Sequence, residues 1–522
     1  MTDDTEAAVP SRHLGIGSLV VVGFFWTTGG IYGTEPALGT APSGYVLIMC
    51  LIMPFFYGLP TALVTAELST HYPETGGQCV FVQEACGPTI GGHNIYWVWV
   101  STIIDAAIYP QYIAQYIAET ADLGEYGGLV DKLLPLAIVI IITSINLFGV
   151  DWMLRFETVL GVLALLPCIA WIGIGIPSIW QQDPAQGELL LPEEIVRFDG
   201  DISYASVVSW CLWLYGGYTN LGVLAGEAKD PRRTYVAAVA ILFPIGVLMR
   251  VLPTLIAFSL DDPASQQPCE LPEQFTCRTE NDGCCPNDVF RAGYFTSVAE
   301  RLGTKVFRSK LGGDIMRYTF FAGSQISFLG LYNAMILNGE RTSFFFFESR
   351  FGAALARRAQ SKSAVQRWLF VMPEVGIRRI YILGNALVAC GFVFLNTKIL
   401  VELEMLVYAT SFLLFIYAFV YLRVNRFPGS KVPEAEAFSI PGGTVCAVLM
   451  VIPPSVIFAI NLGLNCLDRG DMSVLPVPYF KLYSYVGMIL LGVSAQLIYQ
   501  SACKPSSLQD SLLPGDKGSG VV

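Results

Sequence analysis

The stretch TTGGIYG, residues 27–33, places a pair of glycines inside an apolar block near the N-terminus. A second stretch, LYGGYTN at residues 214–220, does the same in a later apolar block. Glycine lowers the cost of leaving helical geometry, so both blocks are predicted to be helices broken at these points. Close helix packing through small residues is the alternative for either pair alone. Two pairs at matching positions of two halves favour the central solute site of a transporter.

The composition around these glycines is that of a membrane protein. Of the 522 residues, 53% are hydrophobic and 14% are charged, whereas soluble domains carry about 25% charged residues. The apolar residues come in blocks of about 20, the length that crosses roughly 30 Å of hydrocarbon. Because backbone polar groups must pair internally in lipid, such blocks are helices. The predicted fold class is an all-α polytopic membrane protein with about twelve transmembrane helices.

The domain organisation follows from the positions of these blocks. A cytoplasmic N-terminal tail covers residues 1–14, a transporter membrane domain covers 15–502, and a cytoplasmic C-terminal tail covers 503–522. The predicted spans lie near residues 15–38, 44–69, 93–118, 132–149, 155–179, 203–224, 235–259, 313–339, 378–396, 399–421, 441–463 and 480–501.

The orientation is predicted from Lys and Arg in the connections. These residues gather at 229–233, 341–379 and 423–431. The three segments are connections between spans, and they lie on the same side of the membrane when the number of spans is even. That side is therefore expected to be cytoplasmic. The external connection near 260–312 contains Cys269, Cys277, Cys284 and Cys285. An oxidising medium favours disulfides among them, free thiols are the alternative, and the pairing cannot be deduced from sequence.

Acidic residues inside apolar blocks are the main functional candidates. A carboxylate at the bilayer centre costs on the order of 2.5–3.5 kcal/mol on insertion scales, so each one is a functional hypothesis. Asp105 lies in the middle of a span, where it would bind an amine or carry a coupling proton; a hydrogen-bonded structural acid is the alternative. Glu35 follows the first glycine pair and would pair with an ammonium group, or lie exposed at the external mouth.

Two further acids are expected near the cytoplasmic face. Glu67 closes the second span and Glu227 follows the second broken helix. Both are interpreted as proton-coupling, gate or helix-end residues rather than direct ligands. Arg250 and Arg317 are their candidate partners, with Arg317 also able to extend to the interface. Aromatic side chains near the glycine pairs would attract an ammonium by cation–π interaction, worth roughly 0.5–2 kcal/mol each, although ordinary packing or lipid contact explains most of them.

Several segments resemble a known superfamily. They are GGIYGTE (29–35), ALVTAELSTHYPETGGQCVFVQEACGP (62–88), IDAAIYP (104–110), LAGEAKDPRRTY (224–235) and YLRVNRFPGSKVPEAEAFSIPGGTVCAVLMVIPP (421–454). The chain resembles the amino acid–polyamine–organocation superfamily, and within it the branch of polyamine and L-type amino acid transporters of plants and protists.

The resemblance implies an inverted 5+5 repeat with broken helices 1 and 6, the LeuT-like arrangement. Repeat one would cover about 15–179, repeat two about 203–421, and spans 11–12 about 441–501. It also implies coupling to protons more often than to sodium. Plant-type polyamine carriers place an acid in span 6 and another in span 8, where this chain has Thr219 and Tyr332. Glu35 and Asp105 match the pattern, so the acidic cage is half present. The predicted substrate-binding residues are Thr28, Gly29, Gly30, Tyr32, Glu35, Asp105, Tyr109, Trp213, Tyr215, Gly216, Gly217, Thr219, Asn220 and Tyr332.

The leading hypothesis is a secondary active transporter, a proton-coupled symporter of polyamines or cationic amino acids. A neutral or L-type amino acid carrier and a non-transporting amino acid sensor are the alternatives. The expected partners are the small amine substrate, the proton and the lipid bilayer, in the plasma membrane or an endomembrane. A net charge of −11 argues against a nucleic-acid partner. Three histidines give little basis for an enzyme, and we expect no cofactor or metal.

The predicted topology makes the cysteine-bearing connection reachable from outside. A membrane-impermeant maleimide should therefore label Cys269–Cys285 in intact cells after mild reduction, and an added tag on the C-terminal tail should react only after permeabilisation. Labelling of the cysteines that requires permeabilisation would contradict the predicted orientation.

Overall fold

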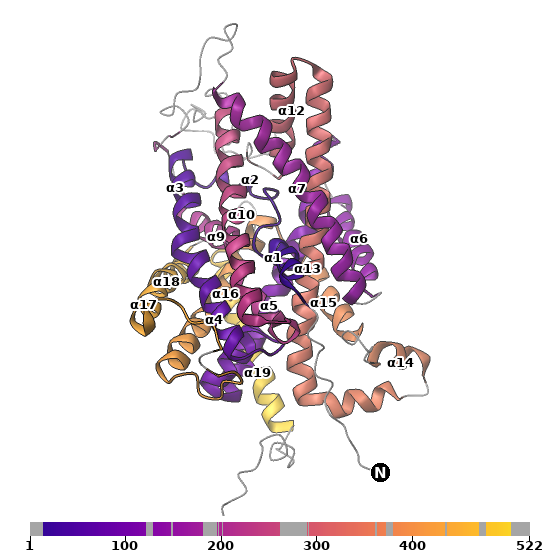
Figure 1. Ribbon diagram of the computed structural model, residues 1–522. Helices are drawn as coiled ribbons and strands as arrows, with labels where there is room; N and C mark the ends of the chain where they lie inside the picture. The colour runs from indigo at the N-terminus through magenta and orange to yellow at the C-terminus, as the bar shows by residue number, and fades with distance from the viewer. Residues whose placement is uncertain are drawn as a thin grey trace, which may run out of the picture. The chain divides into compact units, whose positions relative to one another are not determined.

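The computed structural model describes residues 14–121, 129–147, 150–180, 196, 198–200, 202–260, 290, 292–360, 363–371, 379–433, 436–468 and 477–502. Among these residues every named element is a helix, and one isolated β-bridge joins Leu14 to Ala228. The chain forms two compact units, Met1–Asp468 and Arg469–Val522. The helices of the first unit, labelled in Figure 1, are α1 Ile16–Thr27, α2 Glu35–Leu38, α3 Ser43–Met53, η1 Pro54–Gly58, α4 Leu59–His71, α5 Gln78–Thr120, α6 Leu129–Asn146, α7 Val150–Trp180, α9 Tyr204–Leu214, η2 Tyr218–Glu227, α10 Pro231–Leu260, α12 Tyr294–Phe307, α13 Lys310–Ala359, α14 Ala364–Phe370, α15 Arg379–Phe392, α16 Thr397–Val424, α17 Gly443–Met450 and α18 Ile452–Leu467. The second unit contains α19, Phe480–Ala502.

Six described helical segments are long and apolar enough to cross a membrane. They are Ser43–His71, Arg155–Pro177, Pro231–Leu260, Lys310–Phe347, Thr397–Val424 and Gly443–Leu467. Shorter apolar helices occur at Ile16–Thr27, Leu133–Asn146, Arg379–Phe392 and Phe480–Ala495. Two helices extend well beyond the predicted spans. α13 ends at Ala359 rather than near residue 339, and α5 begins at Gln78 rather than near residue 93. Gly87, with φ 79° and ψ 175°, kinks this helix and separates its first turns from the long segment that follows.

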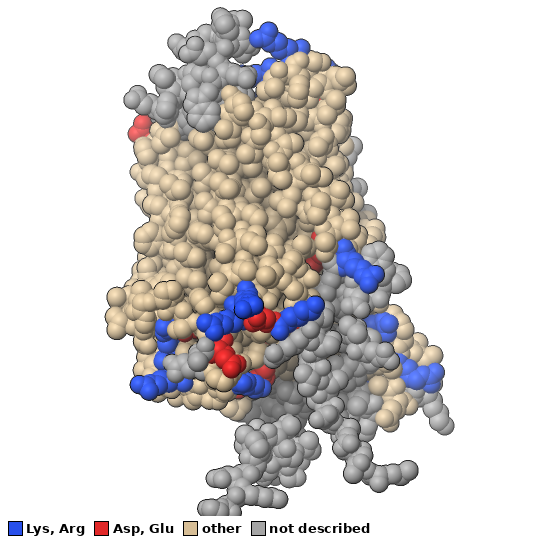
Figure 2. All heavy atoms as spheres, viewed as in Figure 1, with Lys and Arg blue, Asp and Glu red and all other residues tan. Residues whose placement is uncertain are grey.

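The outer surface carries large apolar side chains instead of charges. Examples are Leu387 and Val445, which are 75% and 73% exposed, and Ile140 and Ile141 on α6. Figure 2 shows a broad band without charged side chains, with Lys, Arg, Asp and Glu gathered mainly below it. Contiguous apolar surface of this kind is costly in water and suits hydrocarbon. The protein is an integral membrane protein.

The first broken helix is interrupted at its glycine pair. α1 ends at Thr27, and the backbone N–H groups of Thr28 and Gly29 both donate to the carbonyl of Phe24 at 2.8 Å. Gly29 and Gly30 then adopt φ values of 60° and 95°. This backbone region is energetically costly for every residue that has a Cβ atom. Helical structure resumes only at α2, so a short non-helical segment lies between Thr27 and Glu35.

The second broken helix is interrupted at its own glycine pair. α9 ends at Leu214, and Gly217, with φ 81°, precedes the 3₁₀ helix η2. Stretches of 3₁₀ helix this long are uncommon and mark a hinge or local strain. A Cβ atom on Gly217 would lie 1.8 Å from the carbonyl oxygen of Trp26 on α1. The two interruptions therefore touch backbone to backbone.

The long helix α5 is the centre of the packing. It contacts α13 and α16 extensively, and also α6 and α15. α12 packs back along the start of α13, whereas α14 lies beyond the other end of α13 (Figure 1). These two landmarks distinguish the α12 end of the helices, predicted to be external, from the α14 end, predicted to be cytoplasmic.

Some predicted features lie outside the described residues. They are the four cysteines Cys269, Cys277, Cys284 and Cys285, nearly all of the N-terminal tail and the C-terminal tail from residue 503. The disulfides and the positions of the tails stay predictions.

The close approach at Gly217 predicts a large cost for one added methyl group. We expect Gly217→Ala to destabilise the protein by about 1–3 kcal/mol, the usual cost of overpacking, because the methyl would displace the Trp26 carbonyl. Gly173→Ala on α7 is the matched control, since a Cβ there meets open space. The measurement is the apparent melting temperature in detergent at one scan rate. Equal melting temperatures for the two variants would exclude a tight contact at Gly217.

Candidate functional site

A cavity of about 60 Å³ lies between the two interruptions and their neighbours α5, α10, α13 and α16. One water needs roughly 10–15 Å³ on the same measure, so the cavity has room for several waters or part of a slender solute. The predicted residues that line it are Thr28, Tyr32, Asp105, Tyr109, Trp213, Gly216, Gly217, Thr219 and Asn220. Most of the predicted site therefore meets in one place, although its members come from distant parts of the sequence.

Asp105 of α5 is a hydrogen-bonded carboxylate in the wall of this cavity and is 8% exposed. The indole Nε1 of Trp213 donates to its Oδ1 at 2.9 Å. The hydroxyl of Tyr109, one turn further along α5, lies 3.0 Å from both carboxylate oxygens. Donors directed at a carboxylate stabilise its charged form. Asp105 is therefore held in a fixed orientation beside two aromatic rings.

Glu404 of α16 is a second carboxylate in the same cavity, and the sequence analysis missed it. It is 6% exposed and close enough to Asp105 for the two to interact electrostatically. Its Oε2 has no hydrogen-bond partner within the described residues. The signal was present in the sequence, because this acid interrupts an apolar block just as Asp105 does.

Arg250 of α10 supplies the cavity with a buried cation. Its guanidinium donates to the carbonyl of Gly30 at 3.1 Å and to that of Thr28 at 2.9 Å. The carbonyl between them, on Gly29, accepts a hydrogen bond from the hydroxyl of Ser327 on α13. Carbonyls freed by the interruption must be paired inside a membrane protein. Arg250 and Ser327 therefore pair the three successive carbonyls of residues 28–30.

Aromatic side chains form much of the remaining wall. The rings of Tyr109 and Trp213 stack with centroids 6.4 Å apart. Thr219 shares a 2.7 Å hydrogen bond with the hydroxyl of Tyr408. The cavity wall beside Asp105 is therefore formed by aromatic rings. On the η2 side of the cavity the corresponding side chain, Thr219, is neutral and already hydrogen-bonded.

Five predicted residues do not line the cavity. Gly29 and Gly30 contribute backbone carbonyls to the contacts described above. Glu35 accepts hydrogen bonds from the Tyr116 hydroxyl and from the backbone N–H of Gly293, 3.3 Å away, at the α12 end. The hydroxyl of Tyr215 donates to the carbonyl of Cys50 at 2.6 Å, and that of Tyr332 lies 2.9 Å from Thr143 Oγ1.

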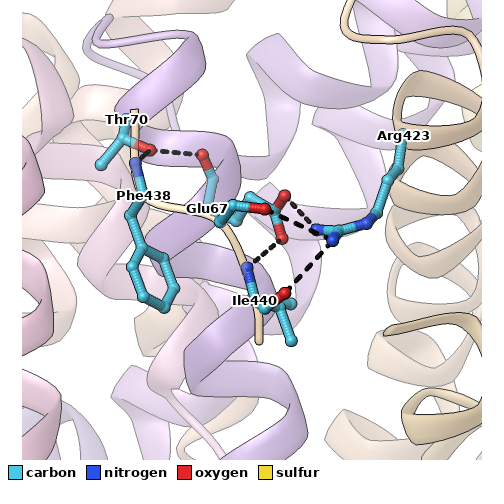
Figure 3. Close-up of polar contacts among 6 residues, drawn as sticks. Glu67, Thr70, Arg423, Phe438 and Ile440 are labelled. Carbon is cyan, nitrogen blue, oxygen red and sulfur yellow. Dashed lines mark hydrogen bonds and ion pairs between the residues drawn. The ribbon is translucent and has the colours of Figure 1, made fainter. Parts of the chain in front are cut away.

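Glu67 lies in a polar cluster that joins three parts of the chain, shown in Figure 3. Its carboxylate forms an ion pair with Arg423 at the end of α16 and accepts the backbone N–H of Ile440 at 3.3 Å. Arg423 also donates to the Ile440 carbonyl at 3.3 Å. Thr70 accepts the N–H of Phe438 at 3.1 Å. The cluster ties α4 and α16 to the segment before α17.

Glu227 has a comparable buried partner. Arg341 of α13 donates to both of its carboxylate oxygens, at 3.0 and 3.3 Å. The predicted partners of Glu67 and Glu227 are therefore wrong, because Arg250 bonds to backbone carbonyls and Arg317 pairs with Glu300 at 2.8 Å. Helix packing decides which charges meet, and sequence spacing does not encode it.

No group of three or more His, Cys, Asp or Glu side chains among the described residues is arranged to hold a metal ion. The site instead combines two carboxylates, one arginine and aromatic rings.

Comparison with known proteins finds transporters and permeases among the relatives of this chain. A protein described as a polyamine transporter in Oryza sativa subsp. japonica is 26% identical, covering 99% of this chain and 85% of its own length. A probable polyamine transporter of Arabidopsis thaliana is 25% identical, covering 89% and 81%. A basic amino-acid permease of Saccharomyces cerevisiae is 25% identical over 45% of this chain and 42% of its own length. The sequence model of the family described as amino acid permease matches residues 14–491, so the chain belongs to the amino acid permease family.

Proposed function

We propose that this permease is a secondary active transporter that couples the uptake of polyamines or cationic amino acids to protons. The observation that carries the proposal is the pair of carboxylates, Asp105 and Glu404, in one buried cavity between two interrupted helices. Two acids against one arginine leave the cavity with a net negative charge when all three are ionised. A buried cavity with net negative charge is suited to a cationic solute.

Asp105 is the proposed amine ligand. Its orientation is fixed by Trp213 and Tyr109, so little ordering is needed when an ammonium group binds. The two rings would add cation–π attraction of about 0.5–2 kcal/mol each. The relatives named as polyamine transporters support an amine substrate for this chain as well.

The proposed fold is the twelve-span, inverted-repeat arrangement, with both termini in the cytoplasm and the plasma membrane or an endomembrane as the location. The interruptions of α1 and of α9–η2 support two related repeats. In this arrangement Glu35 lies at the external end. Arg423, about 28 Å along α16 from Glu404 at 1.5 Å per residue, lies at the cytoplasmic end with Glu67. Glu67 and Glu227, each paired with an arginine, are the proposed cytoplasmic gates.

A neutral or L-type amino acid carrier is the second candidate. Thr219 and Tyr332 replace two acids of the resembling polyamine carriers, and Arg250 brings a positive charge into the cavity. An amino acid would bring its own carboxylate to that arginine and its ammonium to Asp105. Uptake of labelled putrescine, spermidine, arginine and leucine into proteoliposomes separates the two candidates, because the second predicts leucine uptake and no putrescine uptake.

The amine role of Asp105 predicts a strong effect on apparent affinity. Asp105→Asn should raise the KM for the transported amine at least about tenfold, because it removes a charge-assisted contact worth about 1.5 kcal/mol or more. Asp199→Asn, at an exposed position before α9, is the control. Initial uptake rates over a range of concentrations give the KM. An unchanged KM in Asp105→Asn would remove this residue from the amine site.

The gate role of Glu67 predicts different outcomes for single and double variants. Arg423→Met should destabilise the protein by about 3–5 kcal/mol, because it leaves a buried carboxylate unpaired. The double variant Glu67→Gln/Arg423→Met should recover much of the stability yet release preloaded labelled amine from proteoliposomes faster than wild type.

Arg426→Met, at an exposed neighbouring position, should match wild type in both melting temperature and leak. A double variant that retains its label as well as wild type would make the Glu67–Arg423 pair structural and not a gate.

A further inference from the structure

The two carboxylates of the cavity have opposite surroundings. Both oxygens of Asp105 accept hydrogen bonds, from Tyr109 and Trp213. Glu404 is equally buried, but its Oε2 has no hydrogen-bond partner and it forms no ion pair within the described part of the chain. Donors favour the charged form of a carboxylate, whereas burial without donors favours the neutral form. The two acids of this one cavity therefore differ. The hydrogen bonds to Asp105 favour its ionised form, whereas the surroundings of Glu404 favour its protonated form.

The groups that face Glu404 do not supply a compensating cation. Asp105 and Tyr109 approach it from α5, Tyr57 from η1, and Tyr408 from its own helix. Arg250 shares the cavity, but its guanidinium donates hydrogen bonds to the carbonyls of Thr28 and Gly30. A proton on Glu404 would remove the repulsion between the two carboxylates without disturbing any described contact.

Symport requires that proton and amine be bound together. If both used the carboxylate of Asp105, each would displace the other, and the carrier would exchange them in opposite directions. Two carboxylates with different surroundings remove this competition. The amine can pair with Asp105 while a proton occupies the second group, so both can cross in the same closed state.

We propose that Glu404 carries the coupling proton, while Asp105 stays ionised as the amine ligand. This inference rests on the proposed function and deepens it, and it moves the proton role away from Asp105. One O–H bond forms on Glu404 when the cavity opens to the outside, and the same bond breaks when the cavity opens to the inside. The proton favours closure, since a charged Glu404 would be sealed away from water without a partner.

The test compares Glu404→Gln with wild type in proteoliposomes that are supplied with labelled putrescine in the outer medium, with the membrane potential held at zero. A pH difference of one unit should drive about tenfold accumulation by wild type at one proton per amine. Glutamine imitates the protonated acid, so Glu404→Gln should keep equilibrium counterflow but accumulate no putrescine above the outside concentration. Putrescine-dependent alkalinisation of the outer medium should be lost at the same time.

Two further variants serve as controls for this test. Glu402→Gln changes the neighbouring buried acid, which instead bonds to Ser206 at 2.5 Å, and should accumulate putrescine as wild type does. Glu404→Asp restores a titratable group and should restore gradient-driven accumulation, which also covers the case in which Glu404→Gln fails to fold.

The outcomes separate the inference from the function beneath it. Normal gradient-driven accumulation by Glu404→Gln overturns the proton assignment alone, as does loss of accumulation in Glu404→Asp with counterflow intact. A wild type that takes up putrescine without moving protons also overturns it. A wild type that shows no counterflow of any amine tested overturns the proposed function, and the inference with it.

Discussion

The pairing of three carbonyls, on residues 28–30, is the constraint on which the site depends. An interrupted helix in hydrocarbon exposes backbone groups that cannot turn to water, and each must find a partner in the protein. Arg250 and Ser327 provide those partners from α10 and α13. The same contacts bring the arginine into the cavity and hold α1 against both helices. The glycine pair thus interrupts the helix, and the surrounding helices stabilise the interruption by pairing its exposed carbonyls.

The second interruption is held to the first by contact rather than by hydrogen bonds from side chains. Gly217 lies against the carbonyl of Trp26 so closely that a hydrogen atom is the only side chain that fits. This contact sets the separation between α1 and η2, and the cavity is the space left beside it. Asp105 and Glu404 then enter that space from α5 and α16, which pack against each other along their length.

Residues chosen from the sequence coincide with the lining of the cavity where one residue carries the signal by itself. Glycine pairs and an acid within an apolar block can be read without knowing what lies opposite, so Gly217 and Asp105 were both identified. Glu404 was missed although it carries the same signal. Glu402 and Glu404 are two residues apart, about 200° around a helix, so they face in different directions. Only the rotation of α16 against α5 and α9 decides that Glu404 reaches the cavity and Glu402 meets Ser206. The partners of Glu67 and Glu227 were misassigned for the same reason, because ion pairs across helices depend on packing.

The burial of the Glu67–Arg423 pair has a consequence for how the protein responds to its surroundings. Both side chains are almost fully shielded from solvent, so dissolved counterions cannot reach them, and ionic screening acts mainly on charges in contact with water. The strength of this contact is therefore insensitive to the ionic strength of the adjacent compartment. A separation of α4 from α16 therefore has to come through movement of the helices themselves, and not through a change in the salt content of the surrounding solution.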